Sequence, residues 1–398
     1  MKIALVAQHV TPIAGDSTGQ VNDSRLRELS HSLAGNGHQV TVYAQRGTQA
    51  QPVRSELERG VTVEYIGAAD GKAEHAESEL LAQVPAFARP LHERMNADRP
   101  DVVHAMRWTS GLAALAAARD LRLPVVQTFD SLGVAERRYH VLPGDAGTER
   151  IRLESAIGRS ASAVVAGSSD EESDLTRLGV PRRHIRVVPC GVNTDEFNPE
   201  GPVAERTTRP RLVTVADLSE IDALGTLMRA LSKVPGADLV VAGGPETSEL
   251  RDDLAFRRLV KLAETLGVSD QVTFAGQVGR TELPPLLRSA DLMVSVSEYD
   301  PSGILAVQAM ACGTPVIASA VGGLVDAVVD GTTGILVPPG RPALLAQRIR
   351  QLLSHPMLLE AFSVAAADRA QSRYSWERIA HETLAVYGTA LDSAVLAA

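Results

Sequence analysis

The chain has 398 residues, too many for one ordinary hydrophobic core, so two domains are expected. An apolar fraction of 44% and a net charge of −9 indicate a globular protein without general attraction to nucleic acid or anionic membranes. No apolar run approaches the ~18 residues that cross a bilayer, and two cysteines indicate a reducing compartment, so we expect a cytoplasmic protein.

In the first half of the chain, short β-branched runs alternate with longer helical patterns, as is typical of parallel βαβ units. Strands are expected at residues 3–6, 39–43, 62–66, 102–104, 125–128, 163–166 and 185–188. Residues 23–34 show helical spacing and end at Gly35-Asn36-Gly37, which predicts a helix with a glycine stop.

The alternation restarts in the second half, with strands expected at residues 211–215, 238–242, 271–275, 292–296, 316–318 and 334–337. Prolines and glycines interrupt the apolar periodicity just before this point. The predicted fold class is therefore α/β, with two doubly wound parallel sheets. The expected boundaries are a first domain at 1–195, a linker at 196–210, a second domain at 211–375 and a last helix at 376–398.

Two such sheets would also suit a dinucleotide enzyme, but the segment after the first strand does not. Residues 9–20 read HVTPIAGDSTGQ, which contains neither the G-x-G-x-x-G fingerprint nor a P-loop lysine. Nicotinamide chemistry therefore loses support. No cluster of histidine, cysteine and glutamate has the spacing of a metal site.

The most informative segment is 300–319, DPSGILAVQAMACGTPVIAS. An acidic residue and a Pro-Ser-Gly turn lead into an apolar helix, which predicts free N–H groups near Gly303, Ile304 and Leu305. Asp300 would lie beside these groups and Gln308 two turns further on. Because unpaired N–H groups and the helix dipole favour phosphate, the segment predicts an anion site.

This segment resembles the donor-sugar signature of retaining glycosyltransferases of family 4, E-P-x-G-x-x-x-x-E-A-M-A. Asp300 and Gln308 stand where the family has its two glutamates. Five further segments resemble, in order, the sucrose-phosphate-synthase and mycothiol-glycosyltransferase branch. They begin at His9, Asp101, Val188, Val240 and Phe274.

The resemblance implies a GT-B fold, with a cleft between two Rossmann-like domains and a last helix that returns to the first domain. It implies transfer of a hexose, with retention, from a nucleotide sugar to a small-molecule or glycan acceptor, without a required metal or cofactor. The expected partners are a UDP or GDP sugar and a small acceptor. Nucleic acid is not expected, and a homodimer is left open.

The resemblance also assigns roles to individual residues. The donor-binding positions are Gly15, Gly19, Asp217, Asp222, Val278, Asp300, Gly303, Ile304, Leu305 and Gln308. Asp130 and Asp300 are the catalytic positions, and His9, His104 and Arg150 lie on the acceptor side. Ordinary structural roles are the alternatives: a βα turn for the glycines, a cap for Asp300, a satisfied core histidine for His104, and a helical ion pair with Glu154 for Arg150.

Three acids depart from the family pattern at charged positions. Asp130 replaces a histidine, Asp217 an arginine and Asp222 a lysine. A carboxylate about 4 Å from a phosphate oxygen costs on the order of 4 kcal/mol at an effective dielectric of about 20. Either Mg²⁺ bridges Asp217, Asp222 and a diphosphate, or the substrate is neutral or cationic. The rival hypothesis is a catalytically inactive relative that binds or regulates a partner.

Overall fold

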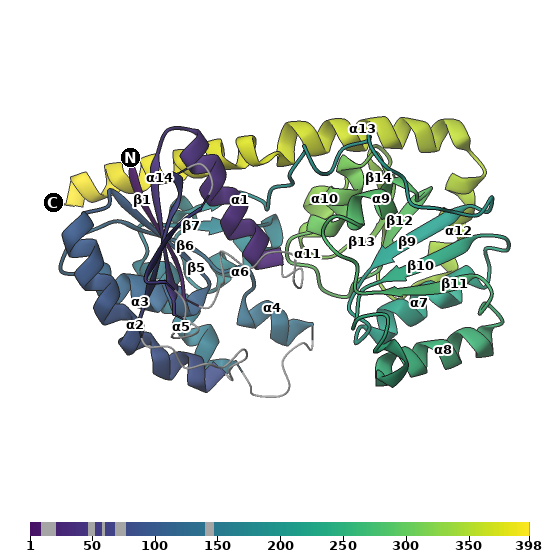
Figure 1. Ribbon diagram of the computed structural model, residues 1–398, viewed down its shortest axis with the longest axis horizontal. Helices are drawn as coiled ribbons and strands as arrows, with labels where there is room; N and C mark the ends of the chain where they lie inside the picture. The colour runs from purple at the N-terminus through teal and green to yellow at the C-terminus, as the bar shows by residue number, and fades with distance from the viewer. Residues whose placement is uncertain (9–20, 47–51, 58–59, 68–76, 140–146, 398) are drawn as a thin grey trace. The chain divides into compact units, whose positions relative to one another are not determined.

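The computed structural model describes residues 1–8, 21–46, 52–57, 60–67, 77–139 and 147–397. Within these residues the chain forms two compact units. The first contains the chain up to Gly191 together with the C-terminal segment from Trp376, and the second contains Val192–Ser375. Figure 1 shows the elements of both units, which are described one at a time.

The first unit has an eight-stranded sheet in the order β3-β4-β2-β1-β5-β6-β7-β8. All neighbouring pairs are parallel except β3–β4. The strands are β1 (Lys2–Ala7), β2 (Gln39–Gln45), β3 (Arg54–Glu56), β4 (Thr62–Ile66), β5 (Val102–Met106), β6 (Val125–Thr128), β7 (Ala163–Ala166) and β8 (Ile185–Val187). The α-helices are α1 (Val21–Gly35), α2 (Glu77–Asp98), α3 (Trp108–Ala118), α4 (Gly133–Arg138), α5 (Thr148–Ser160), α6 (Ser169–Arg177) and α14 (Trp376–Ala397).

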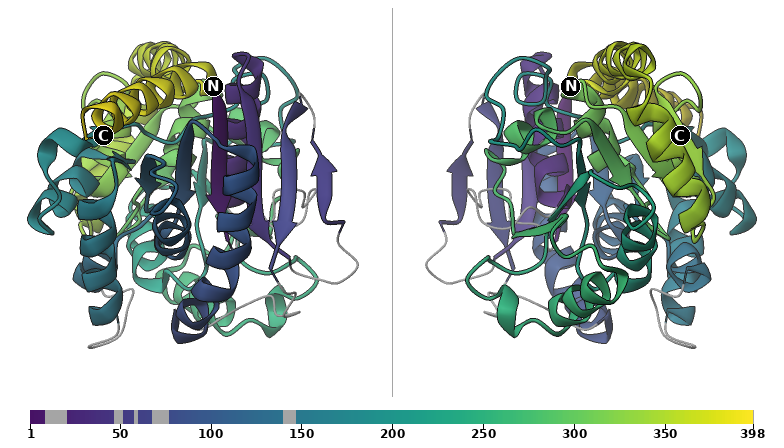
Figure 2. Two further views of the ribbon diagram at one scale, coloured as in Figure 1. Left: turned by 90° about the vertical axis from the view of Figure 1, so that its left-hand side faces the viewer. Right: turned by 90° about the vertical axis from the view of Figure 1, so that its right-hand side faces the viewer.

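Helices cover both faces of this sheet, with α1 and α14 packed together on one face and α2, α3 and α5 on the other (Figure 1). The short β3 forms an outer edge of the sheet, as the two side views of Figure 2 show. Strands β1 and β5 are buried almost completely because each is covered on both faces, which is why they read as continuous apolar runs.

The second unit has a six-stranded, fully parallel sheet in the order β11-β10-β9-β12-β13-β14. Its strands are β9 (Arg211–Val215), β10 (Asp238–Ala242), β11 (Val272–Gly276), β12 (Leu292–Ser295), β13 (Val316–Ser319) and β14 (Gly334–Val337). Its α-helices are α7 (Ile221–Leu231), α8 (Leu254–Leu266), α9 (Leu283–Arg288), α10 (Ile304–Ala311), α11 (Gly322–Ala327), α12 (Pro342–Leu353) and α13 (Pro356–Tyr374). Helix α10 packs on α13, and α7 packs on α8 and α12.

The predicted α/β class with two doubly wound sheets is confirmed. The predicted linker differs from the structure, because residues 196–210 belong to the second unit and the division follows Gly191. Glu196 binds Arg280 with N–O distances of 2.7–3.0 Å, and Arg288 donates to the carbonyls of Glu196, Asn198 and Pro202. None of the described helices is long and apolar enough to cross a membrane.

Candidate functional site

The strand order of each sheet reverses at one point, and ligands of open α/β sheets bind beside the carboxyl ends of the strands there. The reversal lies between β1 and β5 in the first sheet and between β9 and β12 in the second. The segment after β1, with the predicted site residues His9, Gly15 and Gly19, lies outside the described residues. The remaining candidates fall into two groups, one at each of these edges.

Asp300 holds the turn that connects β12 to α10. Its Oδ1 accepts the N–H groups of Gly303 at 2.7 Å and Ser302 at 3.1 Å, and its carbonyl accepts the N–H of Gly323 at 2.8 Å. Burial raises the pKa of Asp300, although the two N–H groups oppose the shift. Both N–H groups bind Oδ1, so this oxygen fixes the turn, and the second carboxylate oxygen takes no part in these two bonds.

The start of α10 corrects part of the sequence prediction. The N–H of Gly303 is bound by Asp300, and the N–H of Ile304 donates to Ser302 Oγ at 3.3 Å, so neither group is free for a phosphate. Gly303 itself is required, because its φ is 65° and a Cβ would lie 2.9 Å from the carbonyl oxygen of Gly323. Leu305 follows, half-buried, in the first turn of the helix.

Gln308 lies on α10, half-buried, where the family pattern has its second glutamate. Its Oε1 is buried and has no hydrogen-bond partner among the described residues. An unpaired buried acceptor costs free energy, so this oxygen calls for a donor such as a hydroxyl group.

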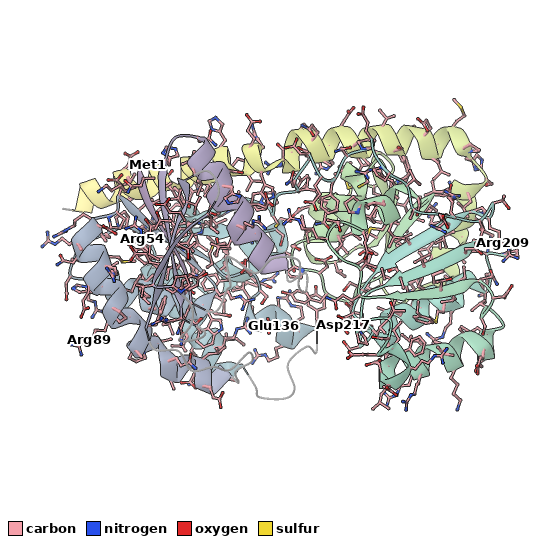
Figure 3. All side chains as sticks on the ribbon, in the orientation of Figure 1. Met1, Arg54, Arg89, Glu136, Arg209 and Asp217 are labelled. Carbon is pink, nitrogen blue, oxygen red and sulfur yellow. The ribbon has the colours of Figure 1, made fainter. Side chains whose placement is uncertain are left out.

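Carboxylates crowd the same edge of the second unit. Asp217, labelled in Figure 3, is exposed in the turn after β9, where its Oδ1 accepts the N–H of Ser219 at 2.8 Å. Glu220 accepts a hydrogen bond from Ser297 Oγ at 2.9 Å, and burial and then the nearby charges of Asp300 and Asp217 raise its pKa. Asp222 is exposed in the first turn of α7.

No group of three or more histidine, cysteine, aspartate or glutamate residues within the described ranges is placed to hold a metal ion. The exposed Asp217 and Asp222 could bind Mg²⁺ only with oxygens that the diphosphate itself supplies. Val278 lies half-buried two residues after β11, next to Gln277, whose N–H donates to the carbonyl of Pro245 at 3.0 Å.

In the first unit, Asp130 follows β6 and forms an ion pair with Arg25 of α1, 2.9 Å between Nη1 and Oδ1. Their side chains are only 11% and 10% exposed, respectively. Burial alone would lower the pKa of Arg25, but Asp130, Cys190 and Glu171 together raise it. Asp130, which stands in the place of the family's histidine, is therefore not an isolated acid, because Arg25 balances its charge.

Two non-glycine residues with positive φ stand side by side at this edge. Asp130 has a φ of 67°, and Arg107, which follows β5, has a φ of 71° and a ψ of 158°. Arg107 Nε lies 4.0 Å from Asp130 Oδ2. Such conformations cost about 1–3 kcal/mol each for a residue with a side chain, and they gather at functional sites.

Glu171, near the start of α6, adds a buried carboxyl group behind this pair. Its Oε2 accepts the N–H of Gly167 at 2.7 Å, whereas its buried Oε1 has no partner among the described residues. Burial raises its pKa to about 7, with Arg25 opposing the shift and Asp130 and Glu154 adding to it. This carboxyl group therefore changes charge near neutral pH.

Glu171→Gln should make the first unit more stable at pH 8.5 by about 1–3 kcal/mol and leave it unchanged at pH 5. The pKa of about 7 is above its unfolded value, so the glutamate's contribution to stability is lost as pH rises through 7. Urea unfolding followed by tryptophan fluorescence measures this, because both tryptophans, Trp108 and Trp376, belong to the first unit. Glu172→Gln is the control, and an equal gain at both pH values would contradict the prediction.

His104 has the contacts of a satisfied core histidine, the alternative that the sequence left open, and its acceptor-side role stays a prediction. It is 1% exposed, its Nδ1 lies 2.7 Å from Tyr387 Oη, and its Nε2 lies 2.8 Å from Thr128 Oγ1. Burial, helped by the charge of Arg25, lowers its pKa to about 3. A neutral imidazole with both nitrogens in use is a core histidine, and it ties α14 to β5 and β6.

Arg150 is also held within the first unit. Its Nε binds Glu154 at 2.7 Å, its Nη1 binds Glu136 at 2.9 Å, and its Nη2 binds the carbonyl of Ser131 at 3.2 Å. Glu136 lies on α4, where Figure 3 labels it. Two carboxylates thus bracket the guanidinium, so the helical ion pair that the sequence left as an alternative is present.

Sequence reasoning missed Arg25, Arg107, Glu171 and Glu220. Arg107 had a usable signal, because it immediately follows a buried parallel strand at the edge where ligands bind. Arg25 had none, since it lies within a helix and meets Asp130 from 105 residues away.

Two family models match the chain. Residues 24–196 match the description "Glycosyltransferase Family 4", and residues 200–369 match "Glycosyl transferases group 1". The D-inositol 3-phosphate glycosyltransferase of Streptomyces bingchenggensis is 31% identical over 98% of this chain and 90% of its own length. The protein of the same name from Mycobacterium tuberculosis is 33% identical over 98% of this chain and 83% of its own length.

Solved structures agree with the sequence comparison. Sucrose-phosphate synthase from Thermosynechococcus elongatus superposes with a TM-score of 0.84 at 28% identity and covers 98% of this chain and 99% of its own. Anabaena HepE in complex with UDP and glucose has a TM-score of 0.72 at 18% identity, over 98% of this chain and 99% of its own, a likeness of fold alone. The chain therefore belongs to the family 4 glycosyltransferases of GT-B fold, and it is a nucleotide-sugar-dependent glycosyltransferase.

Proposed function

We propose that this glycosyltransferase moves a hexose from a UDP or GDP sugar to a small hydroxylated acceptor, with retention at the anomeric carbon. The observation that carries the proposal is the turn before α10. There the second carboxylate oxygen of Asp300 takes no part in the two N–H bonds that fix the turn, and Gln308, on the helix that follows, has a buried Oε1 without a partner among the described residues. Both are acceptors of the kind that sugar and ribose hydroxyls satisfy.

The acceptor remains a choice among small polyols. The relatives named D-inositol 3-phosphate glycosyltransferase make D-inositol 3-phosphate the first acceptor to test. The compartment we propose is the cytoplasm, because both cysteines, Cys190 and Cys312, are buried and unpaired. A homodimer stays a prediction.

The test is transfer from UDP-glucose and GDP-mannose to inositol and D-inositol 3-phosphate, with UDP and GDP titrated in thermal-shift measurements with and without Mg²⁺. Product with retained stereochemistry supports the proposal. Neither product nor a nucleotide-dependent rise in melting temperature would favour the rival, a binding or regulatory relative. Stabilisation that requires Mg²⁺ would assign Asp217 and Asp222 to a metal bridge.

A charge reversal at the edge of the second unit should strengthen nucleotide binding. The double substitution Asp217→Arg and Asp222→Lys should tighten the binding of UDP about tenfold to a hundredfold, because each exposed charge contributes about 1 kcal/mol at 4 Å in water. Isothermal titration calorimetry measures the change. The control is Asp270→Arg, an exposed acid before β11 and so at the opposite edge of the sheet. Equal tightening by the control would show a general effect of net charge.

A further inference from the structure

Arg107 occupies a backbone conformation that is nearly restricted to glycine, and the surrounding structure fixes it there. Its φ is 71° and its ψ is 158°. Its N–H donates to the carbonyl of Thr128 at 2.8 Å, and its carbonyl accepts the N–H of Gly111 at 3.0 Å and Gln127 Nε2 at 3.1 Å. Glycine would fit this position without strain, so the arginine side chain calls for a role of its own.

The charges around Arg107 leave its guanidinium available. Among the described residues, Asp130 is the one carboxylate that forms an ion pair with Arg107, at 4.0 Å from Nε, and Arg25 already binds that carboxylate at 2.9 Å. Arg107 therefore shares Asp130 with a second, closer cation, and Glu171 beside Arg25 has a pKa of about 7 and so carries only part of a negative charge at neutral pH. The side chain of Arg107 is 32% exposed, and its two terminal nitrogens have no hydrogen-bond partner within the described residues.

The start of α3 adds donors at the same place. Helix α3 begins directly after Arg107 and has no side-chain cap. The residues Trp108, Thr109 and Ser110 are 7%, 3% and 1% exposed, and their N–H groups donate no hydrogen bond to any described residue. Buried N–H groups rarely stay unpaired, so these three groups are suited to an acceptor atom of a ligand.

We infer that Arg107 is the specificity-determining cation of this transferase and binds phosphate oxygens of a substrate at the carboxyl edge of β5. This inference rests on the proposed function. At the reversal point of the second sheet, Asp217, Glu220 and Asp300 are acids near enough for their charges to act on one another. In the first unit two carboxylates bracket Arg150, whereas Arg107 shares a single carboxylate with Arg25 among the described residues.

Two sources can supply the phosphate: the diphosphate of the nucleotide sugar or a phosphorylated acceptor. Calorimetric titrations of wild type, Arg107→Gln and Arg107→Gly with UDP, D-inositol 3-phosphate, inositol and pyrophosphate distinguish them. Arg107→Gln should weaken the binding of one phosphate-containing ligand about tenfold to a hundredfold and leave the affinity for inositol unchanged. Weaker binding of UDP would show that Arg107 contacts the diphosphate of the donor, and weaker binding of D-inositol 3-phosphate would show that it contacts the acceptor. Arg119→Gln, an exposed arginine at the other end of α3, is the matched control.

Arg107→Gly separates binding from folding. Because glycine relieves the backbone strain, this variant should melt about 2 °C or more above wild type while losing the same affinity. The inference is overturned if both variants bind UDP, D-inositol 3-phosphate and pyrophosphate as wild type does. In that case transfer by wild type would leave the proposed function standing. If wild type neither transfers nor binds UDP, the proposed function fails, and the pyrophosphate titration still decides the role of Arg107.

Discussion

Asp300→Ala should lower kcat/KM for sugar transfer by about a hundredfold. A hydrogen bond to a charged group contributes about 1.5–3 kcal/mol, and the second carboxylate oxygen of Asp300 would accept such a bond from a hydroxyl of the donor sugar. The substitution also releases the N–H groups of Gly303 and Ser302, so the turn that positions Gln308 loosens. Asp300→Asn, which keeps an acceptor for the turn, should lose only about tenfold.

A second aspartate in the same unit provides the control. Asp253 caps α8, and its Oδ1 accepts the N–H of Phe256 at 2.7 Å, the same distance as the bond from Gly303 to Asp300. Asp253→Ala should cost about 1 kcal/mol of stability and leave transfer unchanged. Initial rates over a range of donor concentrations, with circular dichroism melts of each variant, make the comparison. If Asp300→Ala retains wild-type turnover, Asp300 is a cap and not a substrate-binding residue.

The fold could be predicted because its signals are local. The strands at 125–128, 163–166, 211–215 and 238–242 have the predicted ends, since each is a short run rich in apolar and β-branched residues. Strand β3 was missed because Arg-Ser-Glu at the sheet edge carries no apolar pattern. The linker prediction rested on prolines and glycines, which are typical of a spacer, and such a pattern gives no sign that Glu196 binds Arg280, which lies 84 residues further along the chain.

In the candidate site, too, local contacts could be predicted from the sequence and long-range contacts could not. The turn at Asp300 was predictable because its partners lie two and three residues away. The long-range contacts were not predictable. Arg25 binds Asp130, which lies 105 residues away, and Tyr387 of the last helix forms a hydrogen bond with His104. The sequence shows an acid where the family has a histidine, but whether that acid acts as a charge depends on neighbours that only the packed structure brings together.

Arg150→Met should destabilise the first unit by about 3–5 kcal/mol, because it leaves a buried carboxylate without its cation. Glu154 is fully buried and accepts the N–H of Gly133 at 2.9 Å. Burial raises its pKa to about 7 even with Arg150 beside it, and removal of the arginine raises this pKa further. A raised pKa means that stability is lost as pH rises, so the deficit should be larger at pH 8 than at pH 5.

Urea unfolding followed by tryptophan fluorescence at the two pH values measures this deficit. Arg152→Met, an exposed position on the same helix, should change stability by less than about 0.5 kcal/mol. Adding Glu154→Gln to Arg150→Met should recover much of the loss at pH 8, because the buried charge is gone. A small, pH-independent loss would mean that Arg150 is not committed to Glu136 and Glu154. It would then be available to an anionic acceptor, as the family resemblance implies, and Arg107 would have a competitor for the phosphate.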